Sequence, residues 1–324
     1  MNYINYVKQS PMSMGGMGGV VGSYNFRAAS GGTAAGNAYL GATGVWMNGG
    51  GGAISYKNIS TTGNTADFGD CTISRTWLCG GFQHNGRGVT CGGSSDTDVI
   101  EYITVASPGN ATDFGDLSIA QREGGGCASN AGRGVGGAGY KSAYSGESLE
   151  YVTIANTGNA SDFGELYDDR FEAPGVSSGT RGLFGDGYAD GEQNAIDYIT
   201  IATTGNASDF GNPTVGRYGG AASGNTTRSI FFGGGVSFSG NDTIDYVNPA
   251  STGNATDFGN LVTARWYVSC SACANDTGRA VVGGTNSGGS GTDMDYVTIA
   301  NTGNASDFGD LDVSKNGAGS FSGD

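Results

Sequence analysis

Side chains that could carry out acid–base, nucleophilic or metal chemistry are few in this chain. His84 is the only histidine in 324 residues, and no serine or aspartate is placed by the sequence to form a triad with it. Cys270 and Cys273 have CxxC spacing, yet no second CxxC pair and no nearby histidine completes a zinc site. Asp96 and Asp98 share an acidic loop whose oxygens suit calcium. We therefore expect no cofactor, with calcium in this loop left open.

The triplet Asp-Phe-Gly occurs six times and has a well-known catalytic counterpart. In protein kinases it binds magnesium, but the glycine-rich loop, strand lysine and HRD segment that accompany it there do not occur in this chain. A catalytic motif would also not recur six times, so we predict that the aspartate forms a turn and that the phenylalanine is structural. The phenylalanines are Phe68, Phe114, Phe163, Phe210, Phe258 and Phe308.

The cysteines number six but do not follow this repeat, so their even count does not establish a disulfide framework. Cys79 and Cys91 fall on neighbouring predicted strands and could pair. For the set as a whole we favour buried small side chains. The set is Cys71, Cys79, Cys91, Cys127, Cys270 and Cys273.

Aromatic residues in variable loops are the best candidates for ligand contact. These loops differ in sequence while the segments around them repeat, and loops on a rigid scaffold often carry recognition. Aromatic rings beside polar groups suit sugars or protein surfaces, which gives a partner or glycan contact as one interpretation and solvated hairpin tips as the other. The candidate residues are Tyr140, Tyr144, Tyr188 and Phe238.

The composition excludes several classes of protein. Glycine accounts for 64 residues, which disfavours long helices, while a hydrophobic share of 37% disfavours simple disorder. The net charge of −15, without a basic cluster, makes nucleic acid an improbable partner. The sequence contains no run of about 18 apolar residues, so we expect no segment that spans a membrane. The first residues, MNYINYVKQSPM, lack the apolar core of a signal peptide.

Three markers define an internal repeat of about 48 residues. The Asp-Phe-Gly triplets are 46 to 50 residues apart, each after a tyrosine in an alternating stretch and before a basic residue. The tyrosines are Tyr6, Tyr56, Tyr102, Tyr151, Tyr198, Tyr246 and Tyr296. The basic markers, 18 to 21 residues after a tyrosine, are Arg27, Arg75, Arg122, Arg170, Arg217, Arg265 and Lys315.

Each unit contains four short strand signals and no helical periodicity. The unit from Arg217, for example, has a small-residue stretch, the apolar run RSIFFGGG, the alternating TIDYVNPA and then ATDFGN. Four strands in this length are typical of one propeller blade. We expect the small residues to line the crowded centre, the Phe of the triplet to pack between blades, and the TGN turn to have positive φ.

The order of basic residue, small strand, strand ending in GG, Tyr strand and aromatic strand resembles the kelch repeat of β-propellers. It departs from kelch where the Phe of the triplet replaces the usual Trp. The repeat sequence IDYITIATTGNASDFG, followed by an Arg, is similar to glycine-rich repeats in structural proteins of marine tailed phages. The resemblance implies the fold and a viral origin and carries over no active site. Copper oxidases built on kelch propellers bind their metal with two histidines. This chain has one histidine, so we do not expect it to be such an oxidase.

The repeat predicts one all-β propeller over residues 1–324. We expect seven blades, the last shortened and split between residues 2–26 and 315–324, because the N-terminal Tyr6 and Arg27 keep the phase of the repeat. Six blades with extra terminal strands are the alternative. The expected full repeats are 27–74, 75–121, 122–169, 170–216, 217–264 and 265–314.

We expect a non-enzymatic protein of a virion surface, on a tail or head appendage or as capsid decoration. Its partners would be other virion proteins and a host-surface glycan or protein, and many copies per particle would act by multivalent display. The alternative is a soluble, lectin-like carbohydrate-binding propeller. An open edge on a shortened closing blade could also accept a strand from another chain.

Overall fold

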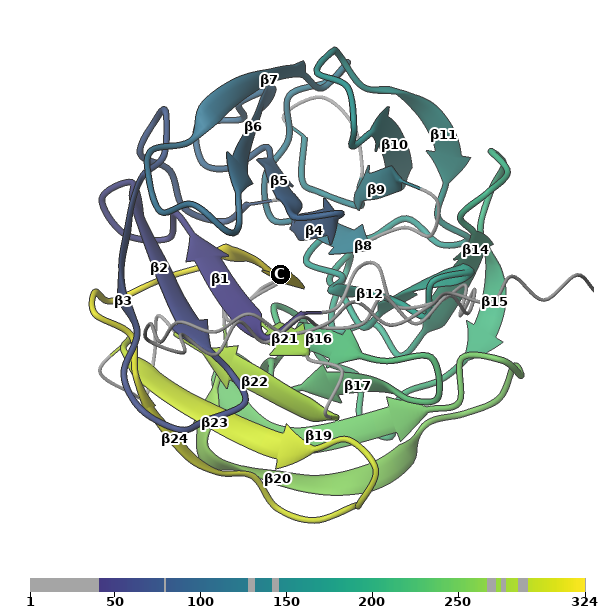
Figure 1. The fold of residues 1–324 in the computed structure, drawn as a ribbon. Helices are drawn as coiled ribbons and strands as arrows, with labels where there is room; N and C mark the ends of the chain where they lie inside the picture. The colour runs from purple at the N-terminus through teal and green to yellow at the C-terminus, as the bar shows by residue number, and fades with distance from the viewer. Residues whose placement is uncertain are drawn as a thin grey trace, which may run out of the picture. The chain divides into compact units, whose positions relative to one another are not determined.

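A computed structural model describes residues 41–78, 80–127, 132–141, 146–266, 272–274, 278–284 and 291–323. The chain divides into two compact units, Met1–Ala34 and Ala35–Asp324, and all of the described residues belong to the second. Within them every regular element is a β-strand, and the strands form six antiparallel sheets arranged as the blades of a propeller (Figure 1).

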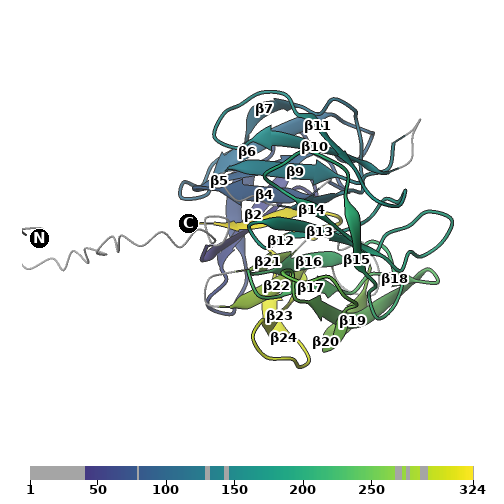
Figure 2. The ribbon, with the colours of Figure 1, turned by 90° about the vertical axis from the view of Figure 1, so that its right-hand side faces the viewer.

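Each blade has four principal strands, which follow one another in order from the centre of the ring to its outer edge (Figures 1 and 2). The inner strands are β25 (Gly319–Gly323), β4 (Gly81–His84), β8 (Gly125–Cys127), β12 (Gly175–Ser177), β16 (Ala221–Gly224) and β21 (Ala272–Ala274). The second strands are β1 (Thr43–Met47), β5 (Arg87–Cys91), β9 (Arg133–Gly137), β13 (Arg181–Gly185), β17 (Ser229–Phe232) and β22 (Arg279–Gly283). The third are β2 (Ala53–Asn58), β6 (Val99–Thr104), β10 (Ser148–Thr153), β14 (Ile196–Thr200), β19 (Ser239–Val247) and β23 (Asp293–Thr298). The outer are β3 (Ala66–Asp70), β7 (Thr112–Asp116), β11 (Ser161–Glu165), β15 (Ser208–Gly211), β20 (Thr256–Arg265) and β24 (Ser306–Asp310), and a short additional strand, β18 (Gly235–Val236), pairs with β19.

The described residues form six blades, as the alternative predicted, and the expectation of seven is wrong. Strand β25, near the C-terminal end, pairs with β1 and completes the blade built by residues 43–70. The last blade packs directly on that first one, because Phe308 shares a core with Trp46 and Ile59. The ring therefore closes within residues 41–323, and the N-terminal segment 2–26, which the count had placed in a seventh blade, lies outside the described residues.

Apolar side chains pack between blades, and each of the six described cores contains one Phe of the triplets. Phe163, for instance, lies with Phe184 and Ile199 of the next blade. The six marker tyrosines of the described residues are half-buried beside these cores and meet the phenylalanines edge to face, at a centroid distance of 5.3 Å for Tyr56 and Phe68. A propeller of this kind is stabilised mainly by burial between sheets, at about 25 cal/mol per Å².

The repetition of TGN and DFG along the chain is explained by contacts at the outer edge of the ring. A Cβ atom on Gly164 would lie 2.5 Å from the carbonyl oxygen of Gly205 in the next blade, which only glycine avoids. The Gly205 N–H donates to the Phe163 carbonyl over 2.7 Å. Gly205 itself has a φ of +149°, as expected for the TGN turn. The same glycine contact recurs between Gly309 and Gly63, where the ring closes.

Buried ion pairs tie the basic markers to the acid that precedes each marker tyrosine. Arg170 pairs with Asp197 at 2.9 Å, and Arg265 pairs with Asp295 at 3.0 Å, all of them almost fully buried. Burial raises the pKa of both aspartates, although the arginines oppose that shift. The acid also accepts a hydrogen bond from the backbone that follows the triplet, as Asp197 does from Tyr167.

Two positions depart from this pattern. Lys315 faces a blade that has Ser55 in place of the acid, and its Nζ donates to the carbonyl oxygens of Asn48 and Ala53 at 3.0 and 2.7 Å. Burial lowers the pKa of Lys315 to about 8. In the other case the buried marker position holds Gln121, not Arg122 as the sequence analysis assumed. In the other described blades the marker follows its tyrosine by 19 residues, whereas Arg122 follows Tyr102 by 20. The spacing alone therefore indicated that Gln121, and not Arg122, occupies the marker position.

A second set of arginines, which the sequence analysis did not identify, links five of the six blades to the next. The Arg133 guanidinium lies 4.4 Å from the ring centroid of Tyr151 and donates to the Ile201 carbonyl at 3.0 Å. Cation–π contacts of this kind contribute about 0.5–1 kcal/mol each. The set comprises Arg87, Arg133, Arg181, Arg228 and Arg279.

Candidate functional site

The turns that lead into the inner strands place side chains on one face of the ring. Two residues after the marker, Trp77, Glu123 and Glu172 have φ values of +51°, +57° and +56°. Backbone hydrogen bonds link these turns in series, from Glu123 N–H to Trp77 at 2.8 Å and from Glu172 N–H to Glu123 at 2.6 Å. Gly219 continues the series to Glu172 at 3.2 Å. Non-glycine residues with positive φ are uncommon and often mark functional positions.

The residue directly after the marker pairs with the loop that follows the second strand. Phe171 and Tyr188 form an isolated bridge with N–H···O distances of 3.0 and 2.8 Å. Arg122 pairs in the same way with Tyr140, and Tyr218 pairs with Gly235. Tyr140 and Tyr188 are thereby held by backbone hydrogen bonds beside the turns.

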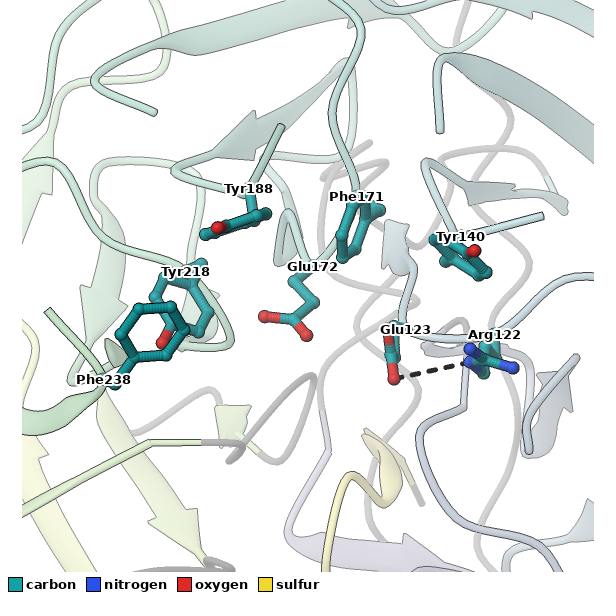
Figure 3. A pocket seen from close by; sticks show the side chains of 8 residues that line it. All are labelled: Arg122, Glu123, Tyr140, Phe171, Glu172, Tyr188, Tyr218 and Phe238. Atoms are coloured by element: carbon teal, nitrogen blue, oxygen red, sulfur yellow. Dashed lines mark ion pairs between the residues drawn. The ribbon is translucent and has the colours of Figure 1, made fainter. Parts of the chain in front are cut away.

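These turns and loops surround a pocket of about 380 Å³ (Figure 3), a volume within the range of small-molecule sites. It extends over three neighbouring blades, those that begin with β8, β12 and β16. The aromatic rings contact one another in sequence, with centroid distances of 5.1 to 6.3 Å. The lining residues are Arg122, Glu123, Tyr140, Phe171, Glu172, Tyr188, Tyr218 and Phe238.

At one end of the pocket the charges are paired within the protein. The Arg122 guanidinium lies over the Tyr140 ring at 4.6 Å, 3.5 Å from Glu123 and 2.9 Å from Asp96. Burial raises the pKa of Glu123, while Arg122 opposes that shift. At this end, therefore, the Arg122 cation contacts both an aromatic ring and a carboxylate.

At the other end none of the described lining residues supplies such a cation to the Glu172 carboxylate. The residue is buried, with 4% exposed, and among the residues that the structure describes its Oε2 atom has no hydrogen-bond partner. Burial, together with repulsion from Glu123, raises the pKa of Glu172 to about 8. Figure 3 shows this carboxylate pointing into the pocket, between Glu123 and the rings of Tyr188 and Tyr218.

The structure brings three of the four loop aromatics of the sequence analysis to this pocket. Tyr140 and Tyr188 line its wall and Phe238, 73% exposed, lies at its rim, whereas Tyr144 lies outside the described residues. Sequence analysis missed the turn residues, such as Phe171 and Glu172. A sequence signal was available, because the two positions after the marker change from blade to blade while the marker itself is arginine in four of the six described blades.

Other candidate chemistry finds less support. In the described segments no group of three His, Cys, Asp or Glu side chains could hold a metal ion, and Asp96 of the proposed calcium loop pairs instead with Arg122. His84 ends strand β4 and is not among the residues that line the pocket. Cys91 is buried, but its proposed partner Cys79 lies outside the described residues. No helix of the described part is long and apolar enough to cross a membrane.

Comparison with known proteins adds no family: no family model matches the chain, and no curated protein matches it in sequence.

Proposed function

We propose that this protein is a non-enzymatic recognition module of a virion surface. It would bind a host-surface component in the pocket of the blades that begin with β8, β12 and β16. The observation that carries the proposal is a preformed cavity lined by five aromatic rings, held by backbone hydrogen bonds between turns and loops. Aromatic pockets with a few placed polar groups are the usual form of a small-ligand site.

The viral part of the proposal rests on the resemblance of the repeat sequence to repeats in phage structural proteins. On a tail or head appendage, or as capsid decoration, many copies would contact other virion proteins and present the pocket outward. Weak binding by each copy would then add through effective concentration. The net charge of −15 suits an exposed, soluble module and opposes binding to nucleic acid.

A soluble carbohydrate-binding propeller is the second candidate, favoured by the same rings. Aromatic side chains such as Tyr188 and the exposed Phe238 offer flat apolar faces beside carboxylates, which suits a sugar. The two candidates share the pocket and differ in where the protein is found.

Particle imaging and an adsorption assay test the proposal together. Cryo-electron microscopy of the source particles should show ordered copies of the propeller on the virion. Particles that carry Tyr188→Ala should adsorb to host cells at least tenfold more slowly than particles that carry Tyr167→Ala, which changes an exposed tyrosine outside the pocket. A protein that is absent from virions would refute the viral assignment, and equal adsorption would refute recognition by the pocket.

A further inference from the structure

We propose that the pocket binds a small organic cation, whose substituted ammonium group lies between the Glu172 carboxylate and the rings of Tyr188 and Tyr218. This inference rests on the proposed recognition function and names its ligand class. Three features of the described residues support it: a buried carboxyl group with one unpartnered oxygen, a set of aromatic rings, and an internal copy of the same chemistry.

The carboxylate supplies the charge. A buried carboxylate oxygen without a hydrogen-bond partner is costly, and where it faces a pocket a bound water, ion or ligand can satisfy it. Glu172 meets this description, since 4% of the residue is exposed and its Oε2 atom has no partner within the described segments. An anionic ligand is disfavoured, because Glu123 lies in the same pocket and the chain carries a net charge of −15.

The rings supply the faces on which a cation rests. Cations bind over aromatic faces within about 6 Å of the centroid, and cages of such rings recognise quaternary ammonium groups. Tyr188 lies 5.1 Å from Tyr218 and 5.7 Å from Phe171, measured between centroids, so three rings gather beside Glu172. The ring planes of these two pairs are inclined to each other at 75° and 54°, so the rings are not stacked face to face.

The other end of the pocket shows the same arrangement with its cation present. There the Arg122 guanidinium lies over the Tyr140 ring and beside the Glu123 carboxylate. The end around Glu172 has the carboxylate and the rings, and the lining residues supply no second cation. A ligand ammonium group would complete it in the way that Arg122 completes the first end.

Binding should follow the ionisation of Glu172. The charged groups that line the pocket around it are Glu123 and Arg122, and Tyr188 and Tyr218 are the neighbouring phenols. Because burial raises the pKa of Glu172 to about 8, a cation would bind more tightly as pH rises from 6 to 9, by up to about tenfold per pH unit below the pKa. Binding would release a proton from Glu172 in the lower part of this range.

The test is calorimetric titration of the full-length protein at pH 9 with choline and with its neutral isostere 3,3-dimethyl-1-butanol. We expect one choline site, with affinity at least tenfold above that for the isostere. Glu172→Gln should weaken choline binding at least tenfold, while Glu165→Gln, the same change in an acid at the outer edge, should leave it unchanged. Tyr188→Leu should weaken it and Tyr188→Phe should retain it, with the melting temperature confirming that each variant folds.

Equal affinity for choline and its isostere, or undiminished choline binding by Glu172→Gln, would overturn the inference. So would saturation by a neutral glycan with no response to choline, an outcome that would leave the proposed recognition function standing. If neither probe binds and the Tyr188→Ala particles adsorb normally, both proposals fail.

Discussion

At the outer edge of the ring, Gly164 and Gly211 meet the following blade in the same way, since a Cβ atom on either would lie 2.5 Å from the glycine of the next TGN turn. At the turns into the inner strands, by contrast, one blade has Glu172 where another has Gly317, with φ values of +56° and +61°. The outer positions are constrained by a neighbouring backbone, so their residues repeat. The turn positions share only a conformation, so their side chains diverge, and the pocket forms where they diverge.

The largest effect should come from breaking the repeated part. Arg217 pairs with Asp186 at 3.1 Å and Asp245 at 3.0 Å, and all three are buried. Arg217→Met would leave two buried carboxylates without their cation and should lower the free energy of unfolding by about 3–5 kcal/mol in urea denaturation. Arg122→Met, which removes a partly exposed pair of the divergent part, should cost less than about 1 kcal/mol. Equal losses would contradict the distinction.

The pH dependence of stability should change at the turn. Since the pKa of Glu172 is about 8 in the folded protein and near 4.5 in the unfolded chain, the folded state binds more protons between these values. Stability should therefore fall as pH rises from 5 to 8 and level off above. Glu172→Gln should reduce this loss by about 2–4 kcal/mol, measured by urea denaturation at pH 5 and pH 9.

Several other buried acids contribute to the slope of the unaltered protein. Burial raises the pKa of Glu123, Asp186, Asp197 and Asp295 as well, so the informative quantity is the difference between the two proteins. Parallel stability curves for the wild type and Glu172→Gln would show that Glu172 is not the buried, unpaired acid of the described structure.

A matched pair of glycines tests the outer edge. Gly211→Ala would place a Cβ atom 2.5 Å from the carbonyl carbon of Gly253 and should destabilise the protein by about 1–3 kcal/mol. Gly205 has a similar φ, +149° against +147°, but no atom within 4 Å of its Cβ position. Gly205→Ala should therefore cost less, and thermal denaturation of the two variants measures the contact separately from the backbone strain.

The smallest effect should come from repairing the one glutamine of the marker series. Gln121 is buried where other blades have arginine, and Glu150 is the acid of that blade. Gln121→Arg should stabilise the fold by about 1 kcal/mol, because it restores the ion pair that the neighbouring blades have. The gain should vanish when Glu150→Gln is combined with it in a double-mutant cycle of urea denaturation curves. Additive effects would refute the pairing.

The propeller architecture was predictable from the sequence because its contacts repeat at fixed spacing, as the Phe and Gly of the triplet do. The number of blades was not, because Tyr6 and Arg27 keep the phase of the repeat while the ring closes through β25 and β1. The aromatic loops were identified from their variability. The variable turn position of Glu172 was visible in the sequence, but its burial and its neighbours from other blades were not.

The most direct test of the account is a structure of the protein with bound choline at pH 9. The account predicts density for the trimethylammonium group within about 6 Å of the Tyr188 and Tyr218 rings and in contact with the Glu172 carboxylate. Density at another surface, or an unchanged pocket at a choline concentration that saturates binding in solution, would contradict the claim that ligand chemistry lies where the repeat diverges.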